Sequence, residues 1–489
     1  DSLDYPVSLV GQGVIHSEYG EYNKSVKCFE NALDLHHQNK ENSNLRELSC
    51  LNNLALSLLH VGQYETARMT LETAMKKHEE IHGEGHETIT LSRIKQKLGL
   101  VDHELGNTDL AIKTFKEVQK IHKRLNDVPD EDVMTLSLHI ASSLSELDEH
   151  TQSLEHVEQA LHLSKKLFGR ADLSYTLAMV YNNAAIVYEH CNRGDKALCW
   201  YRQSLGLIQT IFGDDPHPGK VSSLNNLGNF FSRTYQTNKA VEILENDLEQ
   251  ARNVYHTTPN ITVALTLNNL GAALKRAEKS NESLLYFKEG KEIMDQILGP
   301  NHAHRVTSDI LNNMGTIYQD LGLSHKALQC YKDVYKMNSI IYGEDRASDA
   351  IATVCSNIAC VSEELGDFVQ AKQYFNKAVE IDKKNSSTRN TNLVSSLYGL
   401  SSICEVLEEP EESLKHMEEA REVAKKAGSK TFMVATVLFE LGMKYDEMGR
   451  IEECKRCFQE AKEIGESLAQ EDLSPSVVEL LELLKNLKT

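Results

Sequence analysis

The chain has 489 residues and a formal net charge of −20, from 72 acidic and 52 basic side chains. This surplus of negative charge repels phosphates, which argues against nucleic acid and anionic membrane surfaces as partners. No apolar run approaches the roughly 20 residues that cross a bilayer, and the ten scattered cysteines are typical of reduced thiols, so we expect a cytoplasmic protein without membrane insertion. The opening DSLDYP has neither an initiator methionine nor a targeting pattern, which indicates a fragment or processed form.

From the N-terminus onward, one sequence unit recurs along the chain. Its most regular point is a small residue that we place at the start of a second helix. This residue occurs eleven times, at Ser25, Ala67, Ala111, Ser153, Ala197, Ala240, Ser283, Ala327, Ala371, Ser413 and Cys454. Successive positions are 41 to 44 residues apart, so eleven units tile the chain in nearly constant phase.

Each unit carries further regular positions around that point. A glycine or other small residue stands twelve residues earlier, as at Gly13 and Gly271, and a bulky side chain stands four residues later, as at Phe29 and Phe287. A glycine such as Gly62 often marks the turn between the two helices, where a positive φ is favourable. The pattern therefore predicts antiparallel helix pairs that cross at small residues beside an aromatic or aliphatic plug.

This order of small residue, turn glycine, small residue and aromatic resembles the tetratricopeptide repeat (TPR), and the resemblance covers essentially the whole chain. The segments LNNLA, GQYETA and HGEGH are similar to the long repeats of kinesin light chains and nephrocystin-3-like proteins. The resemblance implies an all-α fold, a right-handed superhelical solenoid of eleven repeats over residues 1–472, with first helices lining a concave surface. After it, an apolar stripe predicts a C-terminal capping helix over residues 473–489, with Val477, Leu480, Leu481, Leu484 and Leu487 on one face.

The stretch HEEIHGEGHE contains the HExxH pattern of zinc proteases, which places His78 and His82 one helical turn apart with Glu79 as a base. In repeat phase, however, the stretch is the end of a second helix and its linker, and His82 stands where Phe212 stands in another unit. On the same reasoning GDDPHPGKV, residues 213–221, is a linker rather than a phosphate loop, and the pair Cys454 and Cys457 lies buried in a helix. We therefore predict no metal, no cofactor and no enzyme activity.

Asparagine recurs at the sixth position of the predicted first helices, at Asn53, Asn183, Asn226, Asn269, Asn313 and Asn357. Inside a helix, asparagine costs roughly half a kcal/mol relative to alanine, so its recurrence needs a reason. One interpretation is peptide binding, because an amide can pair with both the N–H and the C=O of an extended chain, and the resembled families imply such a role at this position. The other interpretation is that these amides bond to neighbouring first helices and set the repeat spacing.

Two observations favour binding. Repeats three, four, ten and eleven carry other residues at the sixth position, namely Lys97, His139, Gly399 and Glu440, whereas stacking alone would require asparagine throughout. A basic island of Arg233, Lys275 and Arg276 interrupts acidic helix ends, which predicts a ligand with an acidic residue near repeats six and seven, although a solvated face is the alternative. The predicted peptide-binding residues are Asn53, Asn183, Asn226, Asn229, Asn269, Asn313, Asn357, Arg233, Lys275 and Arg276.

The functional expectation is a non-enzymatic scaffold or adaptor that binds an extended protein or peptide segment in its concave groove. An alternative from another class is a C-terminal sensor or autoinhibitory TPR region of a larger signalling NTPase of the STAND type, or of another multidomain protein. The sequence leaves both open.

Overall fold

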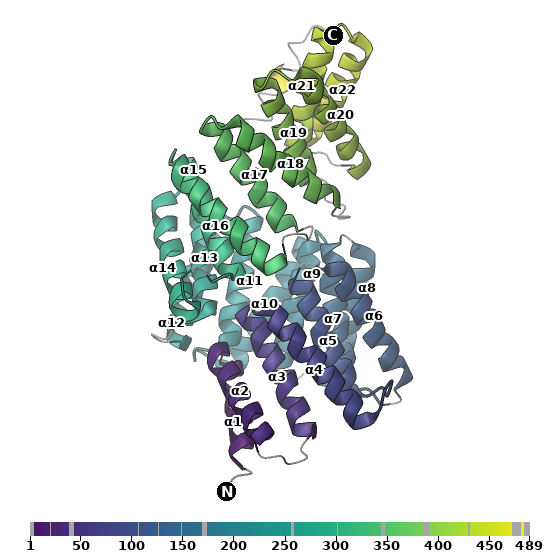
Figure 1. Cartoon of the computed structure of the whole chain (residues 1–489), viewed down its shortest axis with the longest axis vertical. Coiled ribbons are helices and arrows are strands. Elements are labelled where there is room, and N and C mark those ends of the chain that lie inside the picture. The colour runs from purple at the N-terminus through teal and green to yellow at the C-terminus, as the bar shows by residue number, and fades with distance from the viewer. Residues whose placement is uncertain are drawn as a thin grey trace. The chain divides into compact units, whose positions relative to one another are not determined.

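The computed structural model describes residues 4–19, 21–38, 44–105, 107–125, 127–147, 149–168, 174–255, 259–300, 302–343, 348–384, 391–428, 431–471 and 481–483. In this described part, regular secondary structure is helical throughout (Figure 1). The helices are α1 (Asp4–Glu18), α2 (Tyr22–Gln38), α3 (Asn44–Val61), α4 (Tyr64–His82), α5 (Ile89–Glu104), α6 (Thr108–Arg124), α7 (Asp130–Glu146), α8 (His150–Phe168), α9 (Tyr175–His190), α10 (Gly194–Phe212), α11 (Pro218–Arg233), α12 (Thr237–Tyr255), α13 (Ile261–Arg276), α14 (Ser280–Leu298), α15 (Arg305–Asp320), α16 (Ser324–Tyr342), α17 (Asp349–Glu364), α18 (Phe368–Lys384), α19 (Thr391–Val406), α20 (Pro410–Ala427), α21 (Phe432–Glu447) and α22 (Ile451–Glu471).

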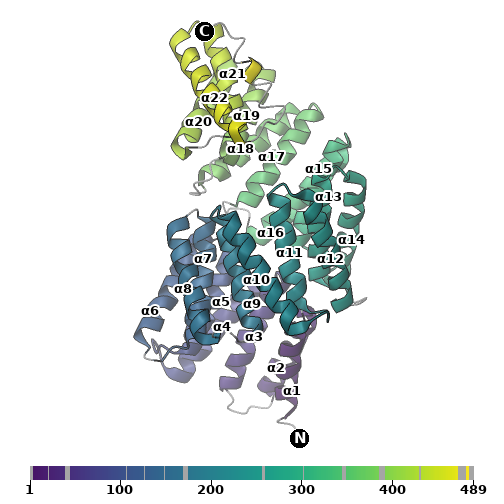
Figure 2. The same cartoon turned by 180° about the vertical axis from the view of Figure 1, so that it is seen from behind.

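The helices form pairs in which an odd-numbered first helix packs against the even-numbered second helix that follows it. This holds from α1 and α2 to α13 and α14, and again from α17 and α18 to α21 and α22. First helices of successive repeats also contact one another, for example α9 with α11 and α11 with α13, so they form a layer of their own (Figure 2). We call the exposed side of this layer the first-helix face. The predicted all-α solenoid of helix pairs is confirmed.

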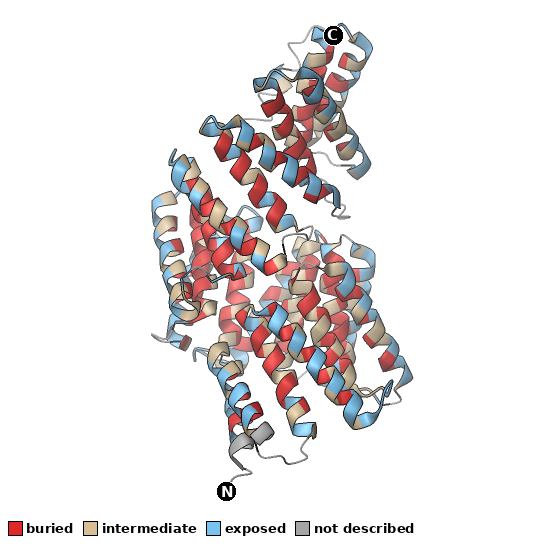
Figure 3. Ribbon diagram, in the orientation of Figure 1, coloured by how far each residue is buried: buried red, intermediate tan, exposed pale blue. Residues whose placement is uncertain are grey.

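The predicted crossing of the two helices is confirmed by close contacts between small residues and the plug. A Cβ atom added to Gly271 would lie 2.7 Å from Cε1 of Phe287, and one added to Gly13 would lie 2.8 Å from Cε1 of Phe29. Where the small residue near the start of the second helix is serine, its hydroxyl can add a bond across the crossing: Ser283 donates to the Gly271 carbonyl at 2.6 Å and Ser25 to the Gly13 carbonyl at 2.7 Å. The helices accordingly carry buried residues along one part of their surface and exposed residues along another (Figure 3).

The turn between paired helices requires a left-handed residue whether or not glycine is present. Gly62 has a φ of 81° and Gly366 a φ of 77°, as the sequence predicts for these turns. At the same position other repeats carry Asn192, Tyr235, Glu278 and Glu408, and these also have φ between 56° and 61°. Glycine is therefore the favoured residue here and the shape of the turn is the constant feature.

Contacts divide the chain into two compact units, Asp1–Asn313 (unit 1) and Met314–Thr489 (unit 2), with the boundary inside α15. The predicted solenoid over residues 1–472 stays a prediction as a single domain. Most of the predicted capping helix, residues 473–489, lies outside the described residues. Residues 481–483 are helical, and the Leu481 side chain lies beside Gly465 of α22.

The cysteines and the helix lengths agree with the expectations from composition. All ten cysteines are free thiols, and both Cys454 and Cys457 are buried, as predicted. None of the described helices combines the length and the apolar character that crossing a membrane requires.

Candidate functional site

The asparagines of unit 1 link one first helix to the next. Asn226 Nδ2 donates to Asn182 Oδ1 at 3.2 Å, Asn269 Nδ2 donates to Asn225 Oδ1 at 2.8 Å, and Asn313 Nδ2 donates to Asn268 Oδ1 at 3.0 Å. Each bond runs from the sixth position of one first helix to the fifth position of the preceding one. We call this series the amide ladder. An amide has two N–H groups and two acceptor lone pairs, so one such bond does not exhaust it.

Other residues make the same link in repeats that lack asparagine. Lys97 Nζ donates to the Asn52 backbone carbonyl at 2.9 Å, and Gln96 Nε2 lies 2.9 Å from His139 Nδ1. The absence of asparagine at the sixth position therefore does not separate binding from stacking, because lysine and histidine perform the stacking role there.

A similar bond occurs in repeat eleven of unit 2, where the Tyr398 hydroxyl donates to Glu440 Oε1 at 2.7 Å. Glu440 occupies the sixth position and Tyr398 the fifth position of the repeat before it. The link between these two positions is thus not confined to asparagine or to unit 1.

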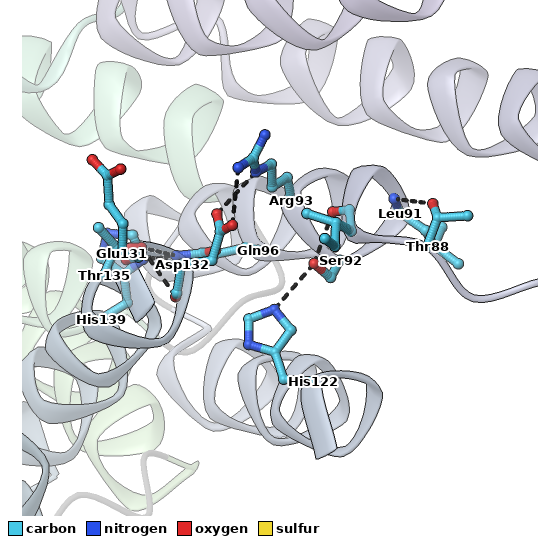
Figure 4. Close-up of polar contacts among 11 residues, drawn as sticks. Thr88, Leu91, Ser92, Arg93, Gln96, His122, Glu131, Asp132, Thr135 and His139 are labelled. Carbon is cyan, nitrogen blue, oxygen red and sulfur yellow. Dashed lines mark hydrogen bonds and ion pairs between the residues drawn. The ribbon is translucent and has the colours of Figure 1, made fainter. Parts of the chain in front are cut away.

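Repeats three and four are cross-linked by further polar contacts, shown in Figure 4. The Arg93 guanidinium of α5 donates to both carboxylate oxygens of Asp132 on α7, each at 2.9 Å. Burial lowers the pKa of His139 to about 4 and that of Lys97 to about 8. The imidazole is therefore neutral at physiological pH. These groups serve the contact between repeats three and four.

A polar hollow lies on the first-helix face of α11, α13 and α15. It has a volume of about 240 Å³. It brings together five of the predicted site residues, Asn229, Arg233, Asn269, Arg276 and Asn313, with Ser232, Asn268, Ala272, Asp309 and Asn312. We call it the inner hollow. All ten residues belong to unit 1.

Both arginines of the inner hollow are anchored by the preceding repeat. Arg233 Nη1 lies 3.1 Å from Glu189 Oε1, and Arg276 Nη1 donates to Ser232 Oγ at 2.7 Å. The Arg233 side chain is nevertheless 58% exposed, whereas that of Glu189 is 13% exposed. A guanidinium has five N–H donors, so a single anchor orients it and leaves donors for a ligand.

Sequence reasoning missed one ionisable wall of the inner hollow. Asp309 is exposed to solvent, yet the surrounding protein raises the pKa of its carboxyl, an effect that Arg305 opposes. Asp309 stands four residues before Asn313, one helical turn away on the same side of α15. This spacing of four residues in the sequence could have identified Asp309 as a neighbour of Asn313. The hollow therefore offers two cationic groups, several amides and one carboxyl.

The other predicted site residues lie outside the inner hollow. Asn53 is on α3, Asn183 on α9 and Lys275 on α13, each half-buried. Asn357 is on α17 in unit 2. Asn226 on α11 also lies outside the lining, so the structure gathers five of the seven predicted residues of repeats six to eight and leaves those of repeats two, five and nine apart.

The histidine stretch has contacts of its own at the end of α4. The rings of His78 and His82 lie 4.6 Å apart, and those of His82 and His86 lie 5.9 Å apart. His78 Nε2 is engaged by the hydroxyl of Thr88 at 2.7 Å, and Thr88 in turn caps α5 by accepting the Leu91 N–H. Burial and the two neighbouring rings lower the pKa of His78. This arrangement joins a second helix to the next first helix, as the repeat phase predicts.

Comparison with protein families matches most of these repeats. Three family models, each described as tetratricopeptide repeat, match residues 4–77, 47–124, 262–338 and 306–384, residues 177–219, and residues 435–465. A model described as anaphase-promoting complex subunit 5 matches residues 362–445. A comparison with curated proteins finds no match. The family matches agree with the helix pairs seen in the structure.

Solved structures with similar chains include a bacterial quorum sensor, NprR from B. thuringiensis in its apo form, at 15% identity and a TM-score of 0.49, over 76% of this chain and 97% of that one. A Rap protein complexed with Competence and Sporulation Factor is similar at 15% identity and a TM-score of 0.48, over 78% and 99%. A kinesin light chain of Podosopora anserina, described as putative, is similar at 16% identity and a TM-score of 0.37, over 43% and 97%.

Proposed function

The chain belongs to the tetratricopeptide-repeat family, and on that premise we propose that it is a non-enzymatic scaffold that holds an extended peptide segment on the first-helix face of unit 1. The observation that carries the proposal is the inner hollow, where two arginines and several amides converge on one small space. Such a set of donors matches the carbonyls and carboxylates of a peptide.

The ligand that fits best has an acidic side chain at the inner hollow. Arginine pairs with a carboxylate through two parallel hydrogen bonds, which are shorter and stronger than bonds between neutral groups. Arg233 and Arg276 come from successive repeats, and each is already oriented by one anchor. A carboxylate between them gains two cations whose side chains lose little further freedom.

The neighbouring amides would form hydrogen bonds with the peptide backbone. Asn229 and Asn269 line the same hollow as the arginines, and each can donate and accept. Because an extended chain rises about 3.3 Å per residue and stacked helices lie about 10 Å apart, about three peptide residues pass each repeat. A segment that spans repeats six to eight therefore needs on the order of six to nine residues.

The test is selection of binding peptides from a random displayed library on the purified chain. The selected peptides are then measured against Arg276→Gln, which keeps a donor for Ser232 and removes the charge, and against the pair Arg233→Glu and Arg276→Glu. We expect peptides enriched in aspartate or glutamate. The charge-reversed pair should bind them at least about tenfold more weakly, because a hydrogen bond to a charged group contributes about 1.5–3 kcal/mol.

The matched control is Arg252→Glu, which changes an exposed arginine of a second helix, α12, that is 51% exposed and pairs with Glu289. This variant should bind the selected peptides like the wild type. Thermal melts of all variants establish that the folds are intact. Peptides without acidic residues, or equal binding by the control and the charge-reversed pair, would contradict the proposal.

A further inference from the structure

Repeat ten of unit 2 gathers three side chains that are all common metal ligands. Among the residues that the structure describes, the ligand atoms of Cys404, Glu412 and His416 all lie within 4.8 Å of one another. Cys404 is fully buried near the end of α19, and its Sγ lies 3.9 Å from Glu412 Oε2. Glu412 and His416 stand four residues apart on α20, so both face the same neighbour. The cluster joins the two helices of one repeat.

The imidazole of this cluster has unused hydrogen-bonding capacity. His416 Nδ1 is buried and has no hydrogen-bond partner in the described part of the chain. Buried polar atoms usually have a partner, so an exception calls for a physical reason. A metal ion bound at Nδ1 supplies one.

We propose that Cys404, Glu412 and His416 bind a divalent transition-metal ion, with zinc the best match to this donor set. One sulfur, one nitrogen and one oxygen donor suit an ion of intermediate softness. Magnesium and calcium fit poorly, because both prefer oxygen donors only. Three protein ligands leave the fourth tetrahedral position to water. The site ties α19 to α20 and so stabilises repeat ten.

The distances require only local adjustment. A tetrahedral ion with bonds of about 2.0–2.3 Å holds its donors about 3.3–3.7 Å apart. The three ligand atoms, now within 4.8 Å of one another, need to approach by about 1 Å, which side-chain rotation can supply. On binding, the Cys404 thiol releases its proton to solvent and forms a sulfur–metal bond in place of the S–H bond.

Lys372 on α18 is the natural competitor of the metal. Its ammonium bonds to Glu412 at 3.0 Å and also to Glu409. Because two carboxylates share this lysine, Glu412 can turn to the metal while Glu409 keeps the ammonium paired. Without metal, the lysine pairs with the carboxylates of the cluster. Its positive charge repels a metal ion, so replacing Lys372 by an uncharged residue should strengthen metal binding.

Equivalent positions of other repeats provide variants that the fold tolerates. Ser362 is the buried counterpart of Cys404, Tyr374 the counterpart of His416, and Leu328 the counterpart of Lys372. The informative variants are therefore Cys404→Ser, His416→Tyr and Lys372→Leu. Cys457→Ser, at another buried cysteine of unit 2, is the control.

The experiment is titration of the full chain with Co²⁺, read by absorption, followed by displacement with Zn²⁺. Wild type and Cys457→Ser should bind one ion with a thiolate-to-cobalt charge-transfer band. Cys404→Ser should lose the band, His416→Tyr should bind at least about tenfold more weakly, since even outer partners of metal sites have effects of that size, and Lys372→Leu should bind more tightly. A wild type without the band, or a band that survives Cys404→Ser, would overturn the proposal.

Discussion

Asparagine at the sixth position of a first helix is a bridging residue in repeats six to eight. Its cost inside a helix is roughly half a kcal/mol relative to alanine, and one hydrogen bond contributes about 0.5–1.5 kcal/mol. The bond from Asn269 to Asn225 can therefore offset the cost of the residue without any ligand. Binding and stacking are compatible in the same side chain, because the bridge uses one N–H of the amide.

Asn183 allows the bridging role of the sixth-position asparagine to be tested apart from peptide binding. In the preceding repeat the fifth position is Leu138, which has no polar side-chain atom to accept a bond. Asn269→Ala should reduce the free energy of unfolding by about 1–3 kcal/mol, since it removes the donor of the buried Asn225 oxygen. Asn183→Ala should change it by less than about 0.5 kcal/mol, because this substitution removes no bond to the fifth position of the preceding repeat. Denaturant unfolding of both variants measures the difference, and equal losses would contradict the bridging role.

At the scale of single residues, the sequence showed which asparagines recur in register and left their contacts open. The recurrence of Asn226 and Asn269 in one register was visible, because a repeat of nearly constant length keeps equivalent residues in phase. That Lys97 replaces them by reaching the Asn52 carbonyl was not predictable, since a long flexible side chain has several partners within reach until the neighbouring helix is placed.

At the scale of the helix pair, glycines at the crossing allow the two helices to approach closely. A Cβ on Gly271 would lie 2.7 Å from the Phe287 ring, which is well inside normal contact. Gly271→Ala should therefore destabilise the fold by about 1–3 kcal/mol through overpacking. Gly206→Ala is the matched control, because Gly206 lies in the interior of α10 with no atom within 4 Å of its added Cβ. It should stabilise the fold by up to about 1 kcal/mol.

A second substitution should rescue the Gly271→Ala variant. Combining Gly271→Ala with Phe287→Leu reproduces the pair of Ala55 and Leu71 found in repeat two. This double variant should recover part of the loss, measured by thermal unfolding. Destabilisation of similar size by Gly206→Ala would show that helix propensity, and not the crossing, sets the effect.

One element departs from the pattern in a way that the sequence does not reveal. In repeat nine the crossing position is Ala359, and the Phe375 ring lies against Gly399 of the next first helix. Gly399 is the sixth-position residue of repeat ten, so the ring takes the space that a ladder side chain would fill. Periodicity predicts that a plug exists at Phe375, but the direction of its ring depends on which neighbour lacks a Cβ atom.

At the scale of unit 1, the start of repeat eight contacts repeats two and three, which lie far from it in the sequence. The buried His304 ring lies over Gly62 of the turn after α3, and Arg305 Nη1 lies 3.1 Å from Glu104 Oε2, 201 residues away in the chain. Burial lowers the pKa of His304 to about 4, so the ring is neutral at physiological pH. Repeat length predicts stacking of neighbours only. How many repeats bring two distant ones together depends on small rotations that accumulate along the solenoid.

Gly62→Ala tests this return contact. The added Cβ would lie 2.5 Å from Cδ2 of His304, whereas the equivalent turn glycine Gly322 has no atom within 4 Å of its Cβ position. Both glycines have a positive φ, 81° and 71°, so both alanine variants carry the same backbone strain of about 1–2 kcal/mol. Gly62→Ala should lose about 1–3 kcal/mol more, because a packed contact is also disrupted.

Hydrogen exchange identifies the cause of that difference. The Val306 and Ser308 amides donate to Nδ1 and the backbone carbonyl of His304, so their exchange reports whether this residue is held in place. They should exchange faster in Gly62→Ala than in Gly322→Ala. Because α15 also carries Asp309 and Asn313 into the inner hollow, the first variant should weaken binding of the selected acidic peptides as well. Equal exchange in both variants would mean that repeat eight does not depend on this contact, and the position of α15 would then have to come from stacking on α13 alone.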